Sequence, residues 1–465
     1  MPIVSGSWPK AYLTGGVIVA GFVFCLAADL PGHLSWDSIV QLLEGRTGRY
    51  MGWHPPFMSW LLGLFDAVLP GTALFVAFDA TLFFGSLYSL VWLRPKVSWA
   101  AAAVALLIVV SPIALLYQGI VWKDVLFADT TVAGFVCLTW ASARWQRAGL
   151  RFALVAVSLV LLGLATMSRQ NGALALLCAI AALGWIASRH EAPRLRMLVT
   201  YAASAAAFAF VFITAANIAL GWRIVAPSGP AKQLRLLEIY DIIGFVAADK
   251  QLPLNELHAY APDLEQAVRT DGVRLYNPER NDPLAASQSL QTALVEAPWD
   301  AIRGQWLDLI LHHPLLYAQV RLEVFRWIFL TPDINACLPY LVGITGPQAQ
   351  MEQLDMEERE DGRDDRLRDY TQWFLQTPVL SHLFYAFLAL GTATLLFIRR
   401  RDADIPIAML QAGTLLFSLS FLIIGIACDY RYLYAMDIAS LVGVFYIALD
   451  WSGFDEIRRL RVRRA

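Results

Sequence analysis

The stretch that decides the fold is residues 35–57, which read Ser-Trp-Asp-Ser-Ile-Val-Gln-Leu-Leu-Glu-Gly-Arg-Thr-Gly-Arg-Tyr-Met-Gly-Trp-His-Pro-Pro-Phe. It separates two apolar runs, 11–30 and 72–93, that are each long enough to cross a bilayer as a helix. Apolar side chains within 39–43 share one side of a helical pattern, and Asp37 lies on another side. This pattern favours a short helix in the membrane interface, between two spans.

Composition places the chain among polytopic membrane proteins. Of its 465 residues 58% are hydrophobic and only 16% are charged, which is more apolar surface than a soluble domain needs. The formal net charge of −2 gives no sign of nucleic-acid binding. The five cysteines form no CxxC pair, so we expect small buried apolar residues and no disulfide framework; they are Cys25, Cys137, Cys178, Cys337 and Cys428.

The apolar runs predict ten membrane spans and an all-α polytopic fold with additional interfacial helices. A thirteen-residue run at 57–69 is too short for an ordinary crossing and is interpreted as a second interfacial helix. The predicted spans are 11–30, 72–93, 98–117, 125–143, 152–167, 172–187, 197–220, 379–398, 405–427 and 430–450.

Three regions follow from this pattern. Residues 1–220 form an N-terminal membrane module of seven spans, whose first outer loop is 31–71. Residues 221–378 are richer in prolines and acids and form a small, mostly helical extracytoplasmic or interfacial region. Residues 379–465 form a C-terminal module of three spans with a basic cytoplasmic tail.

Two apolar pieces of the middle region, 236–248 and 307–330, are expected to be interfacial. The second carries Arg321, Glu323 and Arg326 near its centre, which argues against a crossing. An eleventh span here is the alternative, and it would put the basic tail outside.

Lysine and arginine clusters set the orientation, because such clusters favour the cytoplasmic side. With ten spans all the clusters fall on one side and both termini are cytoplasmic; the clusters are at 94–96, 144–151, 189–196, 399–401 and 458–464. The same topology brings a set of polar residues to one extracytoplasmic face, namely Asp37, His54, Lys123, Asp124, Arg169, Asp429 and Arg431. We therefore predict a single site at that face.

Asp37 is the candidate catalytic residue. A carboxylate beside the membrane can act as general base on an acceptor hydroxyl, because partial burial raises its pKa towards the working range. An acid that ends the first span and caps the following helix explains the same residue without catalysis.

Four residues are candidates for binding a phosphate group. Lys123 lies at the start of the fourth span. Arg169 lies in the turn between two short spans. The planar guanidinium of arginine matches the geometry of a phosphate group. Arg431 and His54 complete the set, and the prolines after His54 hold it in a defined place. Each has a plain alternative: Lys123 can snorkel, His54 can simply turn the chain, and Arg431 can pair with Asp429.

Four further residues are candidates for orienting a substrate, on account of their places beside the first group. They are Asp124, Trp53, Asn171 and Tyr430. An aromatic belt explains the tyrosines at 430–434 equally well. No motif predicts a required metal site, although the paired acids Asp37 and Asp124 could hold Mg²⁺ or Mn²⁺.

The order of these features resembles the GT-C superfamily of polyprenyl-phosphate-dependent glycosyltransferases, nearest to the aminoarabinose transferase and protein O-mannosyltransferase type. The resemblance rests on the acid Asp37 after the first span, the corner at 54–57, Asp124 at the fourth span, Arg169 near Gly172, and Arg431-Tyr432. It covers 11–190 well and 379–450 loosely. The chain departs from the type at Ser38, where the mannosyltransferases have a second acid, and at His54, where the aminoarabinose type has lysine.

The resemblance implies a GT-C-like bundle in the bacterial cytoplasmic membrane, with its site on the extracytoplasmic side. It implies inverting transfer of a hexose or pentose from a polyprenyl-phosphate donor to a glycan, lipid or protein acceptor of the cell envelope, with no required cofactor and no nucleic-acid partner. A polysaccharide polymerase or ligase using lipid-linked glycans is an alternative; such proteins usually rely on arginines in a large outer loop, and the acidic overall character of the middle region counts against it. A transporter or flippase is another, with Asp79 as the mid-membrane acid. A third is a non-catalytic envelope assembly protein.

Overall fold

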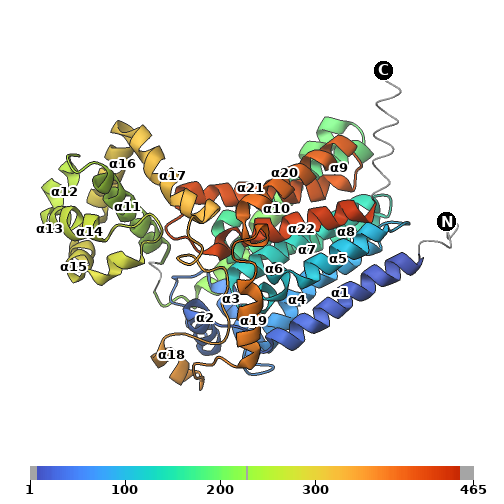
Figure 1. The fold of residues 1–465 in the computed structure, drawn as a ribbon. Coiled ribbons are helices and arrows are strands. Elements are labelled where there is room, and N and C mark those ends of the chain that lie inside the picture. The colour runs from blue at the N-terminus through green and yellow to red at the C-terminus, as the bar shows by residue number, and fades with distance from the viewer. Residues whose placement is uncertain (1–7, 227–228, 451–465) are drawn as a thin grey trace.

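The computed structural model describes residues 8–226 and 229–450, and it consists of helices packed into a bundle with a lobe at one end (Figure 1). In these two ranges no β-strand forms, and only isolated backbone bridges such as Leu34 with Ile344 occur. The bundle helices are α1 (Trp8–Asp29), α4 (Ala73–Val91), α5 (Trp99–Val110), α6 (Pro112–Leu115), α7 (Lys123–Ala143), α8 (Ala148–Ser168), α9 (Ala173–His190), α10 (Arg194–Gly221), α20 (His382–Arg399), α21 (Asp404–Ile424) and α22 (Tyr434–Leu449).

Within the described ranges, nine helices are long and apolar enough to cross a membrane. A tenth span results if α5 and the segment 112–119 count as one, bent by 64°. The chain is therefore an all-α polytopic membrane protein, as predicted. The predicted third span, 98–117, breaks at Ser111-Pro112, because proline has no N–H to continue the helical bonding and its ring clashes with the preceding turn.

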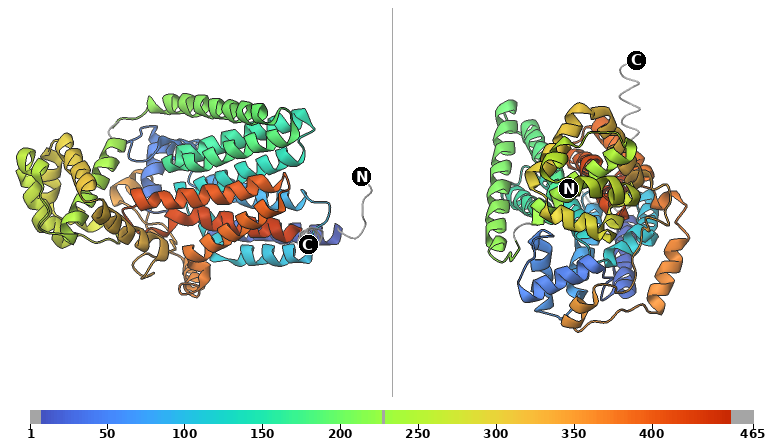
Figure 2. Two further views of the ribbon diagram at one scale, coloured as in Figure 1. Left: turned by 90° about the horizontal axis from the view of Figure 1, so that it is seen from above. Right: turned by 90° about the vertical axis from the view of Figure 1, so that its left-hand side faces the viewer.

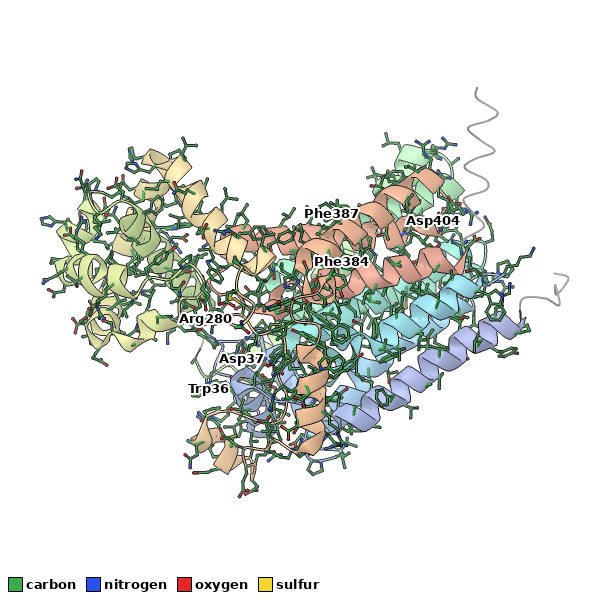
Figure 3. The ribbon with its side chains drawn as sticks, in the orientation of Figure 1. Trp36, Asp37, Arg280, Phe384, Phe387 and Asp404 are labelled. Carbon is green, nitrogen blue, oxygen red and sulfur yellow. A yellow bond between two sulfur atoms is a disulfide. The ribbon has the colours of Figure 1, made fainter. Side chains whose placement is uncertain are left out.

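The bundle has two chemically distinct ends. At one end Asp404 accepts hydrogen bonds from Arg94, Arg399 and the Tyr446 hydroxyl, and Figure 3 places it far from Asp37. Arg151, near the start of α8, pairs with Glu191, which directly follows α9. The arginine-rich turns predicted to be cytoplasmic therefore gather at the end opposite Asp37.

Short helices cover the other end of the bundle. The two interfacial helices predicted between the first spans are present as α2 (Trp36–Thr47) and α3 (Pro56–Asp66). They touch at Gly45, where an added Cβ would lie 2.2 Å from the carbonyl oxygen of Ser59, so only glycine allows this approach. The remaining short elements here are η1 (Tyr117–Gly119), η2 (Gln170–Gly172), α18 (Gln348–Gln353), α19 (Gly362–Gln372), η5 (Pro378–Leu380) and η6 (Tyr430–Leu433).

Residues 229–330 form the outer lobe, which projects beyond the bundle in the left view of Figure 2. At its centre the residues 239–246 of α11 are almost all fully buried, so the segment predicted to be interfacial is instead the core of this lobe. The lobe comprises α11 (Gly229–Ala248), α12 (Asn255–Tyr260), α13 (Pro262–Ala267), η3 (Val268–Gly272), α14 (Val273–Leu275), η4 (Asp282–Ala286), α15 (Gln288–Glu296), α16 (Trp299–His312) and α17 (Pro314–Leu330).

A buried arginine attaches the outer lobe to the bundle. Arg321 of α17 pairs with Asp241 of α11 at 2.9 Å and donates to the carbonyl oxygens of Leu422 and Gly425 at the end of α21. The break at His313-Pro314 divides the run 307–330 between α16 and α17, and neither is among the helices able to span a membrane. This agrees with the prediction that the run does not cross.

The expectation that no cysteines pair is wrong. Cys337 and Cys428 form a disulfide across 91 residues of sequence, and it fixes the loop after α17 beside the segment that leads into η6. Cys25, Cys137 and Cys178 are free, and Cys25 and Cys178 are buried as predicted. The disulfide lies only three residues from Arg431.

Candidate active site

Six residues predicted to share one face do come together in the structure. They arrive on four separate pieces of the chain at the lobe end of the bundle, where Figure 3 labels Asp37 between the lobe and the membrane helices. The six are Asp37, His54, Lys123, Asp124, Arg169 and Arg431, and each is linked to another of them by a hydrogen bond or ion pair.

Asp37 lies in the first turn of α2 and is 26% exposed at its side chain. Its Oδ2 is 2.8 Å from Nη1 of Arg431, and its Oδ1 is 3.4 Å from Nε2 of His54. The carboxylate thus contacts a permanent cation on one side and an imidazole on the other, while part of it remains accessible.

The turn that carries Asp37 is attached directly to the start of α7. Ser38 donates its hydroxyl proton to the carbonyl oxygen of Val121 at 2.7 Å, and the Trp122 indole N–H donates to the hydroxyl of Ser35 at 2.8 Å. Because Val121 and Trp122 immediately precede Lys123, these two hydrogen bonds set the position of the base relative to the cations.

Lys123 and His54 form the second part of the site. The corner at Pro55-Pro56 turns His54 inwards, leaving it 6% exposed, and Nζ of Lys123 lies 2.8 Å from its Nδ1. An ammonium group can only donate, so we assign the proton of the neutral imidazole to Nε2, which faces Asp37. His54 therefore links the lysine to the carboxylate.

Asp124 connects the two arginines. Its Oδ1 pairs with the guanidinium of Arg169, and its Oδ2 is 3.9 Å from Nε of Arg431. Arg431 stacks over the indole of Trp122, and Arg169 stacks over the ring of Tyr432, with guanidinium-to-centroid distances of 4.9 and 5.0 Å. Such stacking holds the planar groups in place and leaves their edges for hydrogen bonding.

The environment shifts the pKa of Asp37 in the direction opposite to our expectation. Burial does raise the pKa, but the hydrogen bond from His54 and the charges of Arg431, His54 and Lys123 outweigh it. The pKa of Asp37 therefore lies well below its ordinary value, and the carboxylate stays ionised at neutral pH. As long as Arg431 holds it, Asp37 is a weak base.

His54 has its pKa lowered from the ordinary value. Burial is the main cause, and the charges of Lys123 and Arg431 act in the same direction, while Asp37 opposes them. His54 is therefore neutral at pH 7. Its one N–H faces Asp37, and it does not add a cation to the site.

Three of the predicted residues do not join this group. Trp53 is 43% exposed and contributes only its carbonyl oxygen, which accepts from Gln233 of α11. Asn171 donates to the hydroxyl of Ser420 at 2.9 Å, which ties η2 to α21. Tyr430 is buried against His382 at a ring distance of 4.1 Å, behind the site.

Asp429, which was also predicted at this face, joins the group, and two further residues at the site are missing from the predicted set. Asp429 lies 3.0 Å from Arg431, and Trp122 and Tyr432 supply the aromatic faces described above. Their adjacency in sequence to Lys123 and Arg431 was the available signal, but an aromatic belt explains such residues equally well. Three basic side chains, Lys123, Arg169 and Arg431, thus lie among three carboxylates.

The residues do not fit a divalent cation in this arrangement. The guanidinium of Arg431 already lies between Asp37 and Asp124, where a metal bound to both acids would have to sit. Among the described residues, one group has metal-ligand geometry, Glu279 with Cys337 and Cys428, but its two sulfur atoms are joined in the disulfide. A disulfide sulfur is not a thiolate ligand.

No family model matches the chain, and no curated protein matches it. Two solved structures align with the chain. One is the archaeal oligosaccharyltransferase AglB from Archaeoglobus fulgidus in complex with an inhibitory peptide and a dolichol-phosphate, with 15% identity, a TM-score of 0.44, and coverage of 98% of this chain and 52% of that chain. The other is the Archaeoglobus fulgidus oligosaccharyltransferase in the apo form, with 13% identity, a TM-score of 0.42 and the same coverage. The chain spans about half the length of each.

Proposed function

We propose that this protein is a membrane glycosyltransferase of the GT-C type. It transfers a hexose or pentose from a polyprenyl-phosphate donor to an acceptor hydroxyl on a glycan, lipid or protein of the cell envelope. The observation that carries the proposal is the placement of one accessible carboxylate, Asp37, directly against a group of cations at the end of a membrane bundle.

The chemistry needs a base and a clamp for the leaving phosphate on one substrate. Asp37 accepts the proton of the acceptor hydroxyl, whose oxygen attacks the anomeric carbon. The bond between that carbon and the phosphate oxygen breaks, and its electron pair leaves with the phosphate. Attack opposite the leaving group inverts the anomeric centre.

Lys123, Arg169 and Arg431 stabilise the charge that develops on the departing phosphate. Groups fixed beforehand in a site of low dielectric do this most effectively, and the stacking on Trp122 and Tyr432 supplies that fixation. The neutral His54 orients Asp37 through its Nε2–H and links it to Lys123.

The pairing of Asp37 with Arg431 couples donor binding to the activation of the base. A donor phosphate competes with Asp37 for the guanidinium, because both offer anionic oxygens. When a phosphate oxygen takes up part of the charge of Arg431, one of the causes that lower the pKa of Asp37 weakens and Asp37 becomes a stronger base. The base is then strong only when the donor is present.

The site faces the extracytoplasmic side of a bacterial cytoplasmic membrane in this proposal, with both termini cytoplasmic. The Cys337–Cys428 disulfide lies at the site end of the bundle, and disulfides persist in oxidising compartments. The arginine-rich turns lie at the opposite end, as the charge distribution of membrane proteins favours. The outer lobe and the segment 331–378 then form the extracytoplasmic region that selects the acceptor.

The test is Asp37→Asn in the purified full chain, reconstituted in vesicles with polyprenyl-phosphate mannose, glucose and aminoarabinose as donors and an envelope extract as acceptor. Transfer is expected to fall by about 10²–10⁴-fold, the usual contribution of a general base. Asp369→Asn, at an exposed position of α19, is the matched control and should transfer normally. Unchanged transfer by a folded Asp37→Asn variant would overturn the catalytic assignment.

A further inference from the structure

α19 lies across the site-end termini of α1 and α5 (Figure 1). Two hydrogen bonds anchor it on either side. The Tyr370 hydroxyl donates to the carbonyl oxygen of Val110 at the end of α5, and Nη1 of Arg363 donates to the carbonyl oxygen of Leu30 after α1, at 3.1 Å.

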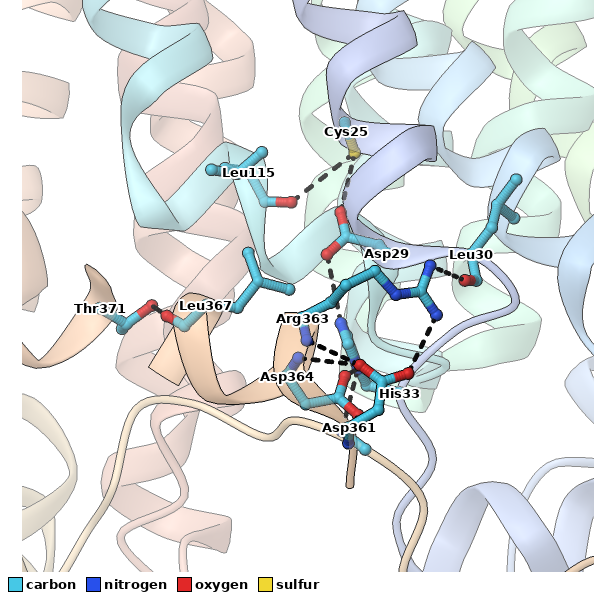
Figure 4. A network of polar contacts seen from close by, with 11 residues as sticks. Cys25, Asp29, Leu30, His33, Leu115, Asp361, Arg363, Asp364, Leu367 and Thr371 are labelled. Carbon is cyan, nitrogen blue, oxygen red and sulfur yellow. Dashed lines mark hydrogen bonds and ion pairs between the residues drawn. The ribbon is translucent and has the colours of Figure 1, made fainter. Parts of the chain in front are cut away.

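A buried histidine lies beside the first turn of α19 on its inner side. Figure 4 shows His33 between Asp29 of α1 and Asp364 of α19, at 3.2 and 3.5 Å, and its Nδ1 also accepts the N–H of Gly343 at 3.0 Å. α19 is thus held by the two hydrogen bonds from Arg363 and Tyr370.

That space is a groove of about 540 Å³ between α1, the α5–α6 break and α19. Its floor is apolar and is formed by Phe24, Ala27, Val110 and Leu115. Phe24 is 57% exposed, so this face of α1 points away from the bundle. In a membrane-spanning bundle such a face meets hydrocarbon, and the volume is in the range of small-molecule sites.

Two arginines of α19, Arg363 and Arg366, complete the lining. The acids around the first turn of α19 lie against other groups: Asp361 pairs with Arg363 at 3.2 Å, Asp364 lies beside His33, and Asp365 pairs with Arg368 at 3.3 Å, while Asp369 forms no ion pair with Arg366 among the described residues. Arg366 is exposed and makes no ion pair within the described part of the chain. An apolar floor below a free guanidinium is complementary to an anionic amphiphile.

We propose that this groove binds one anionic phospholipid of the leaflet on which α19 lies. The acyl chain follows Phe24, Ala27 and Val110, and the phosphate is bound by Arg366 with Arg363. The site is separate from the cation group that contains Asp37, with which it shares no lining residue. It rests on the membrane-spanning fold and not on glycosyl transfer, so either proposal can fail alone.

The test measures lipid retention on the purified full chain by native mass spectrometry, with phosphatidylglycerol, phosphatidylcholine and undecaprenyl phosphate added separately. Phosphatidylglycerol should bind at least tenfold more tightly than phosphatidylcholine. Arg366→Glu and Ala27→Trp should each weaken its binding at least tenfold, the first by charge and the second by filling the groove.

Two matched variants control for general effects. Ala20→Trp adds the same bulk to an exposed position of α1 outside the groove, and Arg274→Glu reverses an exposed arginine of the outer lobe; both should retain phosphatidylglycerol normally. Equal retention by Arg366→Glu, or equal binding of the two phospholipids, would overturn the proposal. Preferential binding of undecaprenyl phosphate through Arg366 would also overturn it, and would assign the groove to the donor lipid.

Discussion

The guanidinium of Arg431 lies 2.8 Å from the carboxylate of Asp37, although one residue opens the last membrane helix and the other follows the first. The same guanidinium reaches towards Asp124 and stacks on Trp122. Arg431 is therefore the residue through which the first and last parts of the chain meet at the candidate site, and, after the hydrogen bond from His54, its charge is the next cause that keeps the pKa of Asp37 low.

Replacing Arg431 should move the pH dependence of the reaction. In Arg431→Gln the pKa of Asp37 rises, because the second-largest lowering cause is removed. The acid limb of the pH–rate profile should therefore shift to higher pH, and kcat/KM should fall by about 10²–10³-fold through loss of the phosphate clamp. Arg431→Lys, which keeps the charge, should show the smaller shift. An acid limb at the same pH in all three proteins would contradict the pairing.

The lowered pKa of Asp37 also determines how its contribution to stability depends on pH. A carboxyl whose pKa is lowered by folding contributes stability that is complete above its unfolded pKa, about 3.9, and is lost as the pH falls through the folded pKa. The Asp37 contribution should thus persist at pH 5, where thermal unfolding of wild type and Arg431→Gln can be compared.

His54 should titrate below its ordinary range. Burial and the charges of Lys123 and Arg431 lower its pKa, so the stabilisation is complete above about pH 6.5 and is lost as the pH falls through the lowered value. NMR of the protein with labelled histidines, with His54→Asn to identify the signal, measures this. In Lys123→Met the signal should titrate at higher pH; a midpoint at or above 6.5 in wild type would contradict the buried neutral imidazole.

Loss of the Cys337–Cys428 disulfide should destabilise the site end of the bundle. The bond closes a loop of 91 residues, and chain entropy assigns such closures a stabilisation of about 2–5 kcal/mol. The double variant Cys337→Ser/Cys428→Ser should melt at a lower temperature and transfer sugar more slowly, since residue 428 lies close to Arg431. Cys137→Ser, at a free cysteine, is the control. Equal melting temperatures of the double variant and the wild type would show that the disulfide does not stabilise this end of the bundle.

The topology can be tested at two glycines where an added side chain would meet no neighbouring atom within 4 Å. A cysteine at Gly362, the first residue of α19, should react with a membrane-impermeant maleimide added outside intact cells. A cysteine at Gly149, near the start of α8, should react only after the membrane is permeabilised. Labelling of the Gly362 variant only after permeabilisation would place the candidate site in the cytoplasm.

Much of the fold could be read from the sequence because the dominant signals are local. Runs of apolar residues predicted the spans, and the periodicity after Asp37 predicted α2. The break at Pro112 could have been anticipated, since proline ends helices, but an apolar run of spanning length outweighed it in our interpretation. The shared face of the polar residues followed from the order of the spans and the arginine clusters.

The remaining features depend on contacts between distant segments, which no local pattern records. The pairing of Cys337 with Cys428 and the attachment of Arg321 to the end of α21 each join separate parts of the chain. The direction of the Asp37 pKa shift was mispredicted for the same reason: the burial of an interfacial acid could be guessed, but not the guanidinium and imidazole placed against it.

Two hydrogen bonds join the first turn of α2 to residues 121–122. Because of them, the distance between Asp37 and Lys123 does not depend on the length of the chain between these two residues. Between Ser38 and Val121 the chain forms the α3 helix, the second span and the bent third span. Asp37 and Lys123 are nevertheless held together by hydrogen bonds that residues close to them in sequence make. Insertions in the intervening loops can therefore be absorbed without moving the two groups apart. A shift of the α7 sequence by one residue cannot be absorbed in this way. It would carry the carbonyl of Val121 away from Ser38 and rotate Lys123 and Asp124 out of the cluster together.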